Sequence, residues 1–158
     1  MNRLLNCYLY ALVAPAEGSL CHFKIGISTD PLKRFSSIQT GCPVPISEMI
    51  YVEMGLAEVA RLAEKELHAR FSERRTTGEW FIFDTAKPAD KQAFNGTMRE
   101  VMAHYLGSEW RWSRISAARV AEVARREQAA ATRKARAATQ ERRRRWFAAL
   151  RKGRHHAY

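Results

Sequence analysis

Cysteine is scarce in this sequence, and the number of cysteines is odd: Cys7, Cys21 and Cys42 are the only three. An odd count without a paired spacing argues against a disulfide framework and against a zinc site. Cys7 and Cys21 fall in segments that we expect to be strands. We therefore predict that both are buried thiols.

Long apolar runs and internal repeats are also missing. No stretch approaches the ~20 apolar residues of a membrane-spanning helix. The first residues lack the apolar run and the small-residue cleavage site of a secretory signal peptide. A cytoplasmic protein is therefore the expectation.

Charge is plentiful but unevenly distributed. The 158 residues carry a formal net charge of +11. Residues 1–108 hold 12 basic and 12 acidic side chains, whereas residues 109–158 hold 15 basic and 4 acidic ones. A neutral part joined to a cationic segment implies a polyanionic partner, most simply nucleic acid. An anionic membrane surface is a weaker alternative, because the only large apolar cluster of the tail is Trp146, Phe147 and Leu150.

Hydrophobic periodicity predicts an α+β fold. Alternating apolar residues indicate strands, and a 3.6-residue period indicates helices. Asp30 and Pro31 suit the start of the first helix, and Thr40-Gly41 suits its end. The predicted order is strand 6–14, strand 20–27, a helix after Asp30, strand 46–54, helix 56–71, a strand or extended segment at 79–83, and helix 87–106.

The tail has its own composition. From Ser113 onward, Ala, Arg, Glu and Gln dominate, and these residues favour helix. Large apolar residues are too few for a coiled coil, so we predict a long solvated helix that orders on its partner. One helix over 113–150 would span about 55 Å. The predicted domains are 1–86, a helix packed on it at 87–108, and the basic tail 109–158.

Basic residues of the tail are the predicted nucleic-acid contacts. Consecutive arginines on a helix point in several directions, so affinity and salt dependence are expected rather than sequence preference. Trp146 and Phe147 could stack on bases or dock on the domain. A disordered solubilising tail is the alternative. The predicted contacts are Arg133, Lys134, Arg136, Arg142, Arg143, Arg144, Arg145, Arg151 and Lys152.

Glu64 and Arg34 are candidate site residues in the domain. Glu64 lies at the rim of the apolar face of helix 56–71, with His68 one turn further along. A carboxylate that is packed on one side and open to solvent on the other suits a hard cation such as Mg²⁺. The alternative is that Glu64 and His68 form an ordinary exposed pair on the helix surface. Glu66 lies on the opposite edge of the same apolar face, so a helical-wheel projection does not choose between Glu64 and Glu66. Arg34 could clamp a phosphate or be a solvated helix arginine.

The hairpin adds further candidates. Tyr8 and Tyr10 could present a phenol beside Lys24 across the two strands, or they could be packing residues. Trp80 and the following Phe81 are expected in the core. Glu79 is ambiguous, and a surface charge at a strand edge is the alternative.

Together these residues resemble the GIY-YIG nuclease superfamily. The resemblance rests on Tyr8-Leu9-Tyr10, Lys24-Ile25-Gly26, Arg34, Glu64 with His68, and Gly78-Glu79-Trp80-Phe81. It is closest to the compact subgroup named after a bacteriophage DNA-binding domain and a meiotically up-regulated yeast gene, and it covers about residues 7–84. It implies a three-stranded antiparallel sheet flanked by helices, which agrees with the β-β-α-β-α order.

The resemblance also implies roles for individual residues. Tyr10 would orient or deprotonate the attacking water, and Gly26 would stand where the backbone comes close to its neighbours. Arg34 would bind phosphate and Glu64 would bind the metal. The implied reaction is in-line hydrolysis of a DNA phosphodiester with one Mg²⁺ or Mn²⁺.

Three departures from the superfamily pattern stand out. Tyr8 replaces a glycine, Lys24 replaces a tyrosine, and the late asparagine of many members has no match. Lys24 could act as a base only if burial or neighbouring cations lowered the pKa of its amine well below the ordinary value. It could instead stay charged and hold a phosphate. His68 could supply part of the lost function as a general base or phosphate contact. The main alternative is a non-catalytic DNA-binding protein, such as a phage or mobile-element regulator. An RNA-associated protein is a third and weaker option, because a polybasic helix does not distinguish RNA from DNA.

Overall fold

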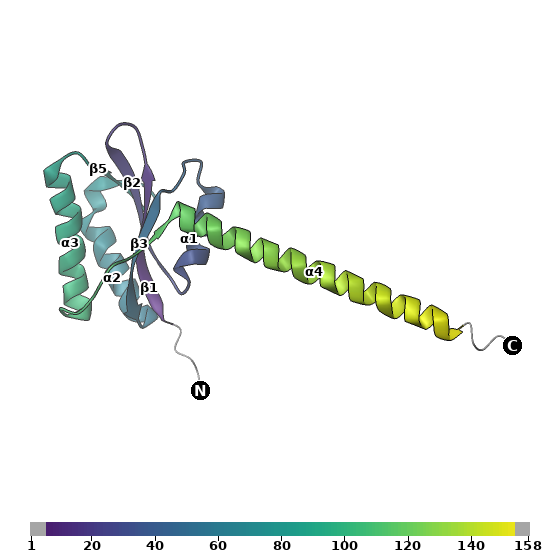
Figure 1. Ribbon diagram of the computed structural model, residues 1–158. Helices are drawn as coiled ribbons and strands as arrows, with labels where there is room; N and C mark the ends of the chain where they lie inside the picture. Colours follow the sequence, from purple (N-terminus) through teal and green to yellow (C-terminus); the bar gives the residue numbers. More distant parts are fainter. Residues whose placement is uncertain (1–5, 154–158) are drawn as a thin grey trace. The chain divides into compact units, whose positions relative to one another are not determined.

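A computed structural model describes residues 6–153 of the chain (Figure 1). Strands and helices are mixed along the sequence, so the fold is α+β as predicted. The elements in chain order are β1 (Cys7–Pro15), β2 (Leu20–Ser28), α1 (Pro31–Gly41), β3 (Glu48–Gly55), α2 (Ala57–Arg70), the 3₁₀ turn η1 (Ser72–Arg74), β4 (Arg75–Thr77), β5 (Trp80–Asp84), α3 (Pro88–Leu106), β6 (Ser113–Ser116) and α4 (Ala117–Gly153).

The sheet has six antiparallel strands in the order β4-β5-β2-β1-β3-β6. The expectation of a three-stranded sheet is therefore wrong. The three long strands predicted from the sequence form the centre, and three short strands extend it at both edges. β5 corresponds to the strand or extended segment expected at 79–83. β4 and β6, of three and four residues, carry too little periodicity to be read from sequence, and their pairing is set by distant partners.

Helices cover both faces of the sheet (Figure 1). β1 is apolar on both faces, with Leu9 and Ala11 in one core and Tyr10 and Leu12 in the other. Helices α2 and α3 pack on the first of these faces. Helix α1 and the first turn of α4 pack on the second, where Phe35 is buried. Like β1, β3 reaches both cores, with Met49 in the second and Val52 and Met54 in the first.

Local signals explain the helix boundaries. The Asp30 carboxylate accepts the backbone N–H of Lys33 at 3.1 Å, and Pro31 occupies the first turn, so α1 starts where the sequence predicts. The other predicted helices agree with α2 and α3 to within one residue at each end. Cys7 is buried as predicted, whereas Cys21 is only half-buried, and both are free thiols.

The tail starts with a strand, not with a helix. Ser113–Ser116, predicted as the beginning of the helix, pairs with β3 as β6 and buries Ile115. The hydroxyl of Ser116 then accepts the backbone N–H of Arg119 at 3.2 Å, which caps the helix that follows. α4 is a continuous helix of 37 residues, about 55 Å long.

The chain divides into two compact units between Val120 and Ala121. We call the first, which contains the sheet, α1–α3 and the first turn of α4, the sheet unit. The second is the remainder of α4. The predicted domain limits at 86 and 108 stay predictions, although α3 packs against α2 and β5 within the sheet unit. Over residues 6–153, none of the helices combines the length and apolar character needed to cross a membrane.

Candidate active site

Tyr10 lies at the centre of the candidate site. It faces Gly26 across the β1–β2 pair, and its side chain is 0% exposed. Its hydroxyl oxygen accepts the Nε–H of Arg34 from α1 at 3.1 Å. A Cβ atom at Gly26 would lie only 2.5 Å from that hydroxyl oxygen, so a side chain there would displace the phenol. This close approach is a physical reason for the glycine that the resemblance places at this position.

Lys24 lies two residues before Gly26, on the same face of β2. Its Nζ lies 2.5 Å from Oε2 of Glu79, and the Lys24 side chain is 14% exposed against 44% for Glu79. Burial acts to raise the pKa of the Glu79 carboxyl, but the hydrogen bond and charge of Lys24 outweigh it and hold that pKa below its ordinary value. Lys24 therefore stands in the site as a cation bound to a carboxylate.

A tight turn places Glu79 beside β2. Gly78 has φ +54°, a left-handed conformation that favours glycine, and its carbonyl accepts Nη1–H of Arg75 at 2.8 Å. The next carbonyl, that of Glu79, accepts the backbone N–H of Ile25 at 3.2 Å. The Gly78-Glu79 dipeptide thus fixes the only carboxylate that pairs with Lys24 among residues 6–153.

Helix α2 contributes Glu64 and His68. Nε2 of His68 lies 3.0 Å from the carbonyl oxygen of Ile25. Because a carbonyl can only accept, Nε2 carries the hydrogen, and in the neutral form of the ring Nδ1 keeps its lone pair. Glu64 is half-buried, and its carboxylate makes no hydrogen bond or ion pair with any residue that the structure describes.

The charges of these side chains act on one another. Burial raises the pKa of the Glu64 carboxyl above its ordinary 4.5, and the negative charge of Glu79 adds to that effect. His68, Lys24 and Arg34 act in the opposite direction without cancelling it. The site is therefore one electrostatic cluster, in which an unpaired carboxylate is surrounded mainly by potential cations.

Tyr10 is poorly suited to accept a proton. Burial raises the pKa of its phenol, although the Arg34 hydrogen bond and charge act to lower it. A buried phenol with a raised pKa holds its proton tightly. Its hydroxyl instead fixes Nε of Arg34, whose guanidinium makes no ion pair with residues 6–153. The remaining N–H groups of Arg34 are thus left for a ligand.

The structure separates Glu64 from Glu66, which the helical wheel could not do. The Glu66 carboxylate is bound by Arg70 at 2.7 Å, and Arg70 also binds Glu100 of α3. Glu66 thus belongs to a surface ion-pair network on the α3 side of the helix. Glu64 is the carboxylate that joins the site.

All five predicted catalytic residues come together. We call the following group the site cluster: Tyr10, Lys24, Arg34, Glu64, His68 and Glu79. Glu79 belongs to it, although the sequence left its role open. The feature of the sequence that could have identified Glu79 is Gly78 directly before it, because a glycine there indicates a tight turn beside a strand.

Three motif aromatics lie outside the site cluster. Tyr8 packs edge to face on Tyr51 with ring centroids 5.7 Å apart. Phe81 is fully buried, as expected of a core residue. Trp80, also expected in the core, is only half-buried and lines a surface cavity.

Over residues 6–153, His, Cys, Asp and Glu side chains form no group of three or more that could hold a metal ion by themselves. Glu64 and Glu79 are the carboxylates of the site cluster. Any hard cation there would take most of its ligands from water or from substrate oxygens, which is the usual situation for Mg²⁺.

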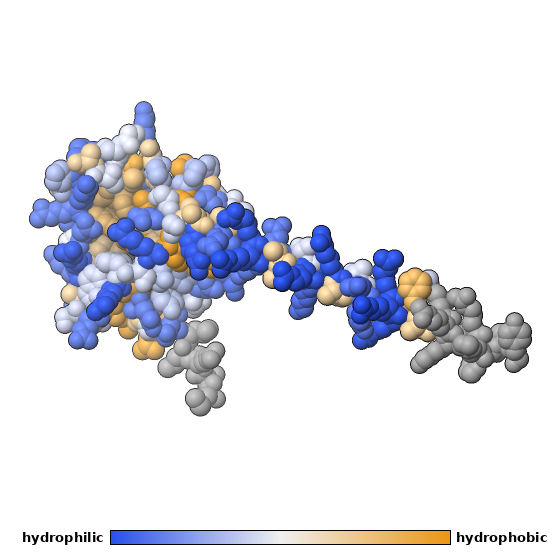
Figure 2. Space-filling view, viewed as in Figure 1, coloured by the Kyte–Doolittle hydropathy of each residue, from blue (hydrophilic) through white to orange (hydrophobic). Residues whose placement is uncertain are grey.

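The predicted nucleic-acid contacts of α4 are exposed, and the helix surface is mostly hydrophilic (Figure 2). Arg145 pairs with Glu141 at 2.9 Å. The other predicted contacts whose side chains are described make no ion pair with residues 6–149; they are Arg133, Lys134, Arg136, Arg142, Arg143 and Arg144. The side chains of Arg151 and Lys152 lie outside the described part.

Comparison with known proteins gives one match. The T5orf172 domain matches residues 7–126, which include the whole site cluster. No curated protein and no solved structure matches the chain. T5orf172 is a phage-named domain of the nuclease-like set. Because the match spans well over half of the sequence, the chain belongs to the T5orf172 domain family.

Proposed function

We propose that this chain is a metal-dependent DNA endonuclease of the GIY-YIG type, which hydrolyses phosphodiester bonds. One observation carries the proposal: the half-buried Glu64 carboxylate has no bonded partner among residues 6–153, while Lys24, Arg34 and His68 act on it electrostatically. Such a carboxylate is costly for the fold unless a ligand uses it.

The carboxylates of the site cluster fit one Mg²⁺ or Mn²⁺. Burial and the charge of Glu79 raise the pKa of Glu64, and a bound dication would relieve both effects. Mg²⁺ accepts one or two protein carboxylates and completes its shell with water and phosphate oxygens. Glu64 would be its ligand, and Glu79 keeps one oxygen that Lys24 does not use. Such an ion supplies Lewis-acid stabilisation of charge on the phosphate.

Arg34 and Lys24 would bind the scissile phosphate. The Nε of Arg34 is already held by Tyr10, so the guanidinium is oriented before substrate arrives. Fixed cations that face developing negative charge lower the barrier without reorganising at the moment of reaction. Tyr10 is then a positioning residue for Arg34.

His68 is the group best placed to accept the proton of the attacking water. Its Nε2–H is held by the Ile25 carbonyl, which leaves Nδ1 as the basic nitrogen. Imidazole is the side chain most often used as a general base near neutral pH. This assignment avoids the buried phenol of Tyr10 and the ion-paired amine of Lys24.

Helix α4 would hold the DNA backbone. Exposed arginines without acidic partners are free to neutralise phosphates and release counterions. Such contacts raise affinity for any sequence, and no base-reading pattern is required of the helix.

A non-catalytic DNA-binding protein is the second candidate. It is favoured by the ion pair between Lys24 and Glu79, because Lys24 stands where the superfamily has a tyrosine and the ion pair occupies it. In that case the site cluster would bind a phosphate without cutting.

Plasmid nicking at low salt with Mg²⁺, Mn²⁺ or EDTA tests the proposal. We expect the wild type to cut only with metal, Glu64→Gln to lose cutting by at least about 100-fold, and Glu66→Gln to cut normally. Glu66 is a matched control, since it lies on the same helix but is paired with Arg70. Gel shifts in EDTA measure binding separately. Binding by all three proteins without metal-dependent cutting would leave the second candidate.

A further inference from the structure

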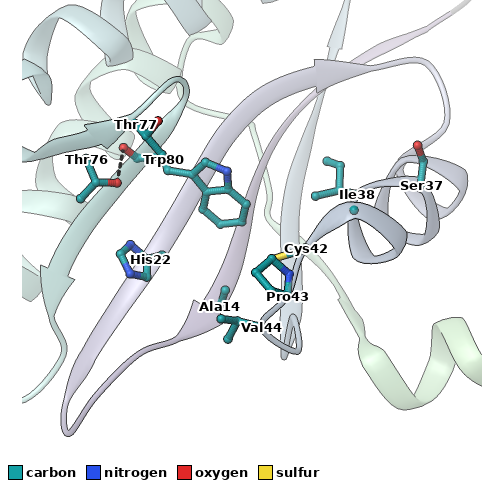
Figure 3. A pocket seen from close by; sticks show the side chains of 11 residues that line it. Ala14, His22, Ser37, Ile38, Cys42, Pro43, Val44, Thr76, Thr77 and Trp80 are labelled. Atoms are coloured by element: carbon teal, nitrogen blue, oxygen red, sulfur yellow. Dashed lines mark hydrogen bonds between the residues drawn. The ribbon is translucent and has the colours of Figure 1, made fainter.

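A cavity of about 390 Å³ opens beside the site cluster, between the sheet and the C-terminal end of α1 (Figure 3). Its walls come from β1, β2, β4, β5, α1 and the loop after α1. No residue of the site cluster lines it. The volume falls at the lower end of the range of small-ligand sites. We call it the Trp80 cavity.

Trp80 supplies the aromatic wall. Its indole reaches from β5 across the cavity toward Cys42 and Pro43 of the loop after α1 (Figure 3). The ring is half-buried, and Ile38 of α1 adds apolar surface to the same cavity. A rigid ring exposed to a cavity offers a flat face on which a planar ligand can stack.

Polar side chains without hydrogen-bond partners in the described part of the chain also line the cavity. The side chains of His22, Ser37 and Thr77 line the cavity, and none makes a hydrogen bond with residues 6–153. Nucleobases carry donors and acceptors on their edges and a π face, and proteins bind unpaired bases by combining stacking with edge contacts. The cavity therefore offers both elements of base recognition.

The cavity is adjacent to the proposed phosphate site. Lys24 is the cross-strand neighbour of Trp80, and its Nζ lies 5.7 Å from the centroid of the indole ring. His22 lies two residues from Lys24 along β2, and Ile38 lies one turn from Arg34 along α1, so each step is about 6–7 Å. A base joined to a phosphate held by Lys24 and Arg34 can therefore reach the ring.

We propose that the Trp80 cavity binds one unstacked base of the nucleic acid whose phosphate lies in the site cluster. This inference rests on the proposed function and deepens it, because it names the substrate class. Bases of a continuous duplex are stacked on both sides and enter such a cavity only after unstacking. The preferred substrate is then a nucleic acid with an unpaired or displaced nucleotide beside the bond that is cut.

The test compares two DNAs bound by the full chain in EDTA, where metal-dependent hydrolysis cannot occur. One is a duplex with a single bulged 2-aminopurine, and the other is the same duplex without the bulge. We expect the wild type to prefer the bulged DNA by about tenfold, since stacking one base on an aromatic side chain contributes a factor of roughly 5 to 150. The fluorescence of 2-aminopurine should fall on binding.

Four variants locate the effect. Trp80→Leu removes the aromatic face and Ser37→Phe fills the cavity, so both should lose the preference for the bulge. Trp80→Phe keeps an aromatic ring and should retain it. Ser36→Phe is the control for Ser37→Phe, because both serines are exposed on α1 but only Ser37 lines the cavity. Thermal unfolding of each variant confirms that it is folded.

Each outcome decides between the two proposals. Equal binding of both DNAs by the wild type, or a retained preference in Ser37→Phe, overturns the base-binding inference and leaves metal-dependent nicking of plasmid untouched. If the preference for bulged DNA depends on Trp80 but the protein never nicks plasmid, base binding in the Trp80 cavity is supported and the nuclease proposal is overturned. Failure to bind either DNA overturns both.

Discussion

The sheet unit and the remainder of α4 both carry many charged side chains, but they use them differently. In the sheet unit, Lys24 is held by Glu79 and Arg34 by Tyr10, so each cation has one defined position. Along α4, most of the predicted contact residues are exposed and lack an acidic partner in the described part of the chain. The pairs in the sheet unit hold each cation in one position. The unpaired cations of α4 can attract a polyanion without holding it in one defined position.

Glu64 shows why the difference matters. In the sheet unit the neighbouring Glu66 pairs with Arg70. Glu64 has no such partner among residues 6–153, although it is half-buried and its pKa is raised. An unpaired charge on α4 costs little because water solvates it, whereas the same charge in the sheet unit indicates a site for a ligand.

Among the variants that test this comparison, the largest expected effect comes from breaking the geometry of the sheet unit with Gly26→Ala. The new Cβ would lie 2.5 Å from the Tyr10 hydroxyl, so the phenol must shift and release Arg34. We expect a loss of about 1–3 kcal/mol in the free energy of unfolding, as for other overpacked cores, and a nicking rate reduced at least about tenfold. Urea unfolding and plasmid nicking measure the two effects.

The double variant Gly26→Ala with Tyr10→Phe is the control for this effect. Removing the hydroxyl removes the closest contact of the new Cβ, so stability should partly return. Activity should stay low, because Arg34 then lacks its partner. If Gly26→Ala alone leaves both stability and nicking unchanged, the close approach of Tyr10 is not what orients Arg34.

Replacing Arg142, Arg143, Arg144 and Arg145 by glutamine tests the other side of the comparison. Glutamine keeps a good helix propensity, so α4 should remain helical by circular dichroism. Each arginine that neutralises a phosphate contributes about 0.9 to the slope of log affinity against log salt. We expect weaker DNA binding with a shallower slope, and an unchanged nicking rate at saturating DNA. An unchanged slope would mean that these arginines do not contact phosphate.

The smallest expected effect concerns pH. Because the pKa of Glu64 is raised, the folded chain favours the protonated carboxyl, so the stability linked to this group is present at low pH and is lost as pH rises through the raised pKa. Cation binding needs the ionised form. The stabilisation of the fold by Mg²⁺, measured as the shift in Tm, should therefore appear only above the ordinary 4.5 of a glutamate.

Glu79→Gln sharpens that measurement. The charge of Glu79 helps to raise the pKa of Glu64, so removing it should move the onset of Mg²⁺ stabilisation to lower pH. Glu66→Gln should leave the onset in place, since Glu66 is paired with Arg70. If Glu79→Gln leaves the pH at which Mg²⁺ stabilisation begins unchanged, the cation does not bind beside Glu64 and Glu79.

Much of the fold was predictable because its signals are local. The Asp30-Pro31 start of α1, the apolar face of α2 and the alternation of β1 are each contained within one segment. β6 escaped prediction for the opposite reason. It is four residues long at the edge of a helix-forming segment, and only its pairing with β3 makes it a strand.

The sequence by itself determined which residue types are present, the order of the long strands and helices, and the concentration of positive charge after residue 108, because composition and periodicity are properties of the chain alone. Tertiary structure alone decided that Glu64 rather than Glu66 joins the site, that Glu79 pairs with Lys24, and that the Tyr10 hydroxyl lies against Gly26. Those facts depend on which side chains meet across strands and helices that are far apart in sequence, and a helical wheel contains no information about the neighbouring element.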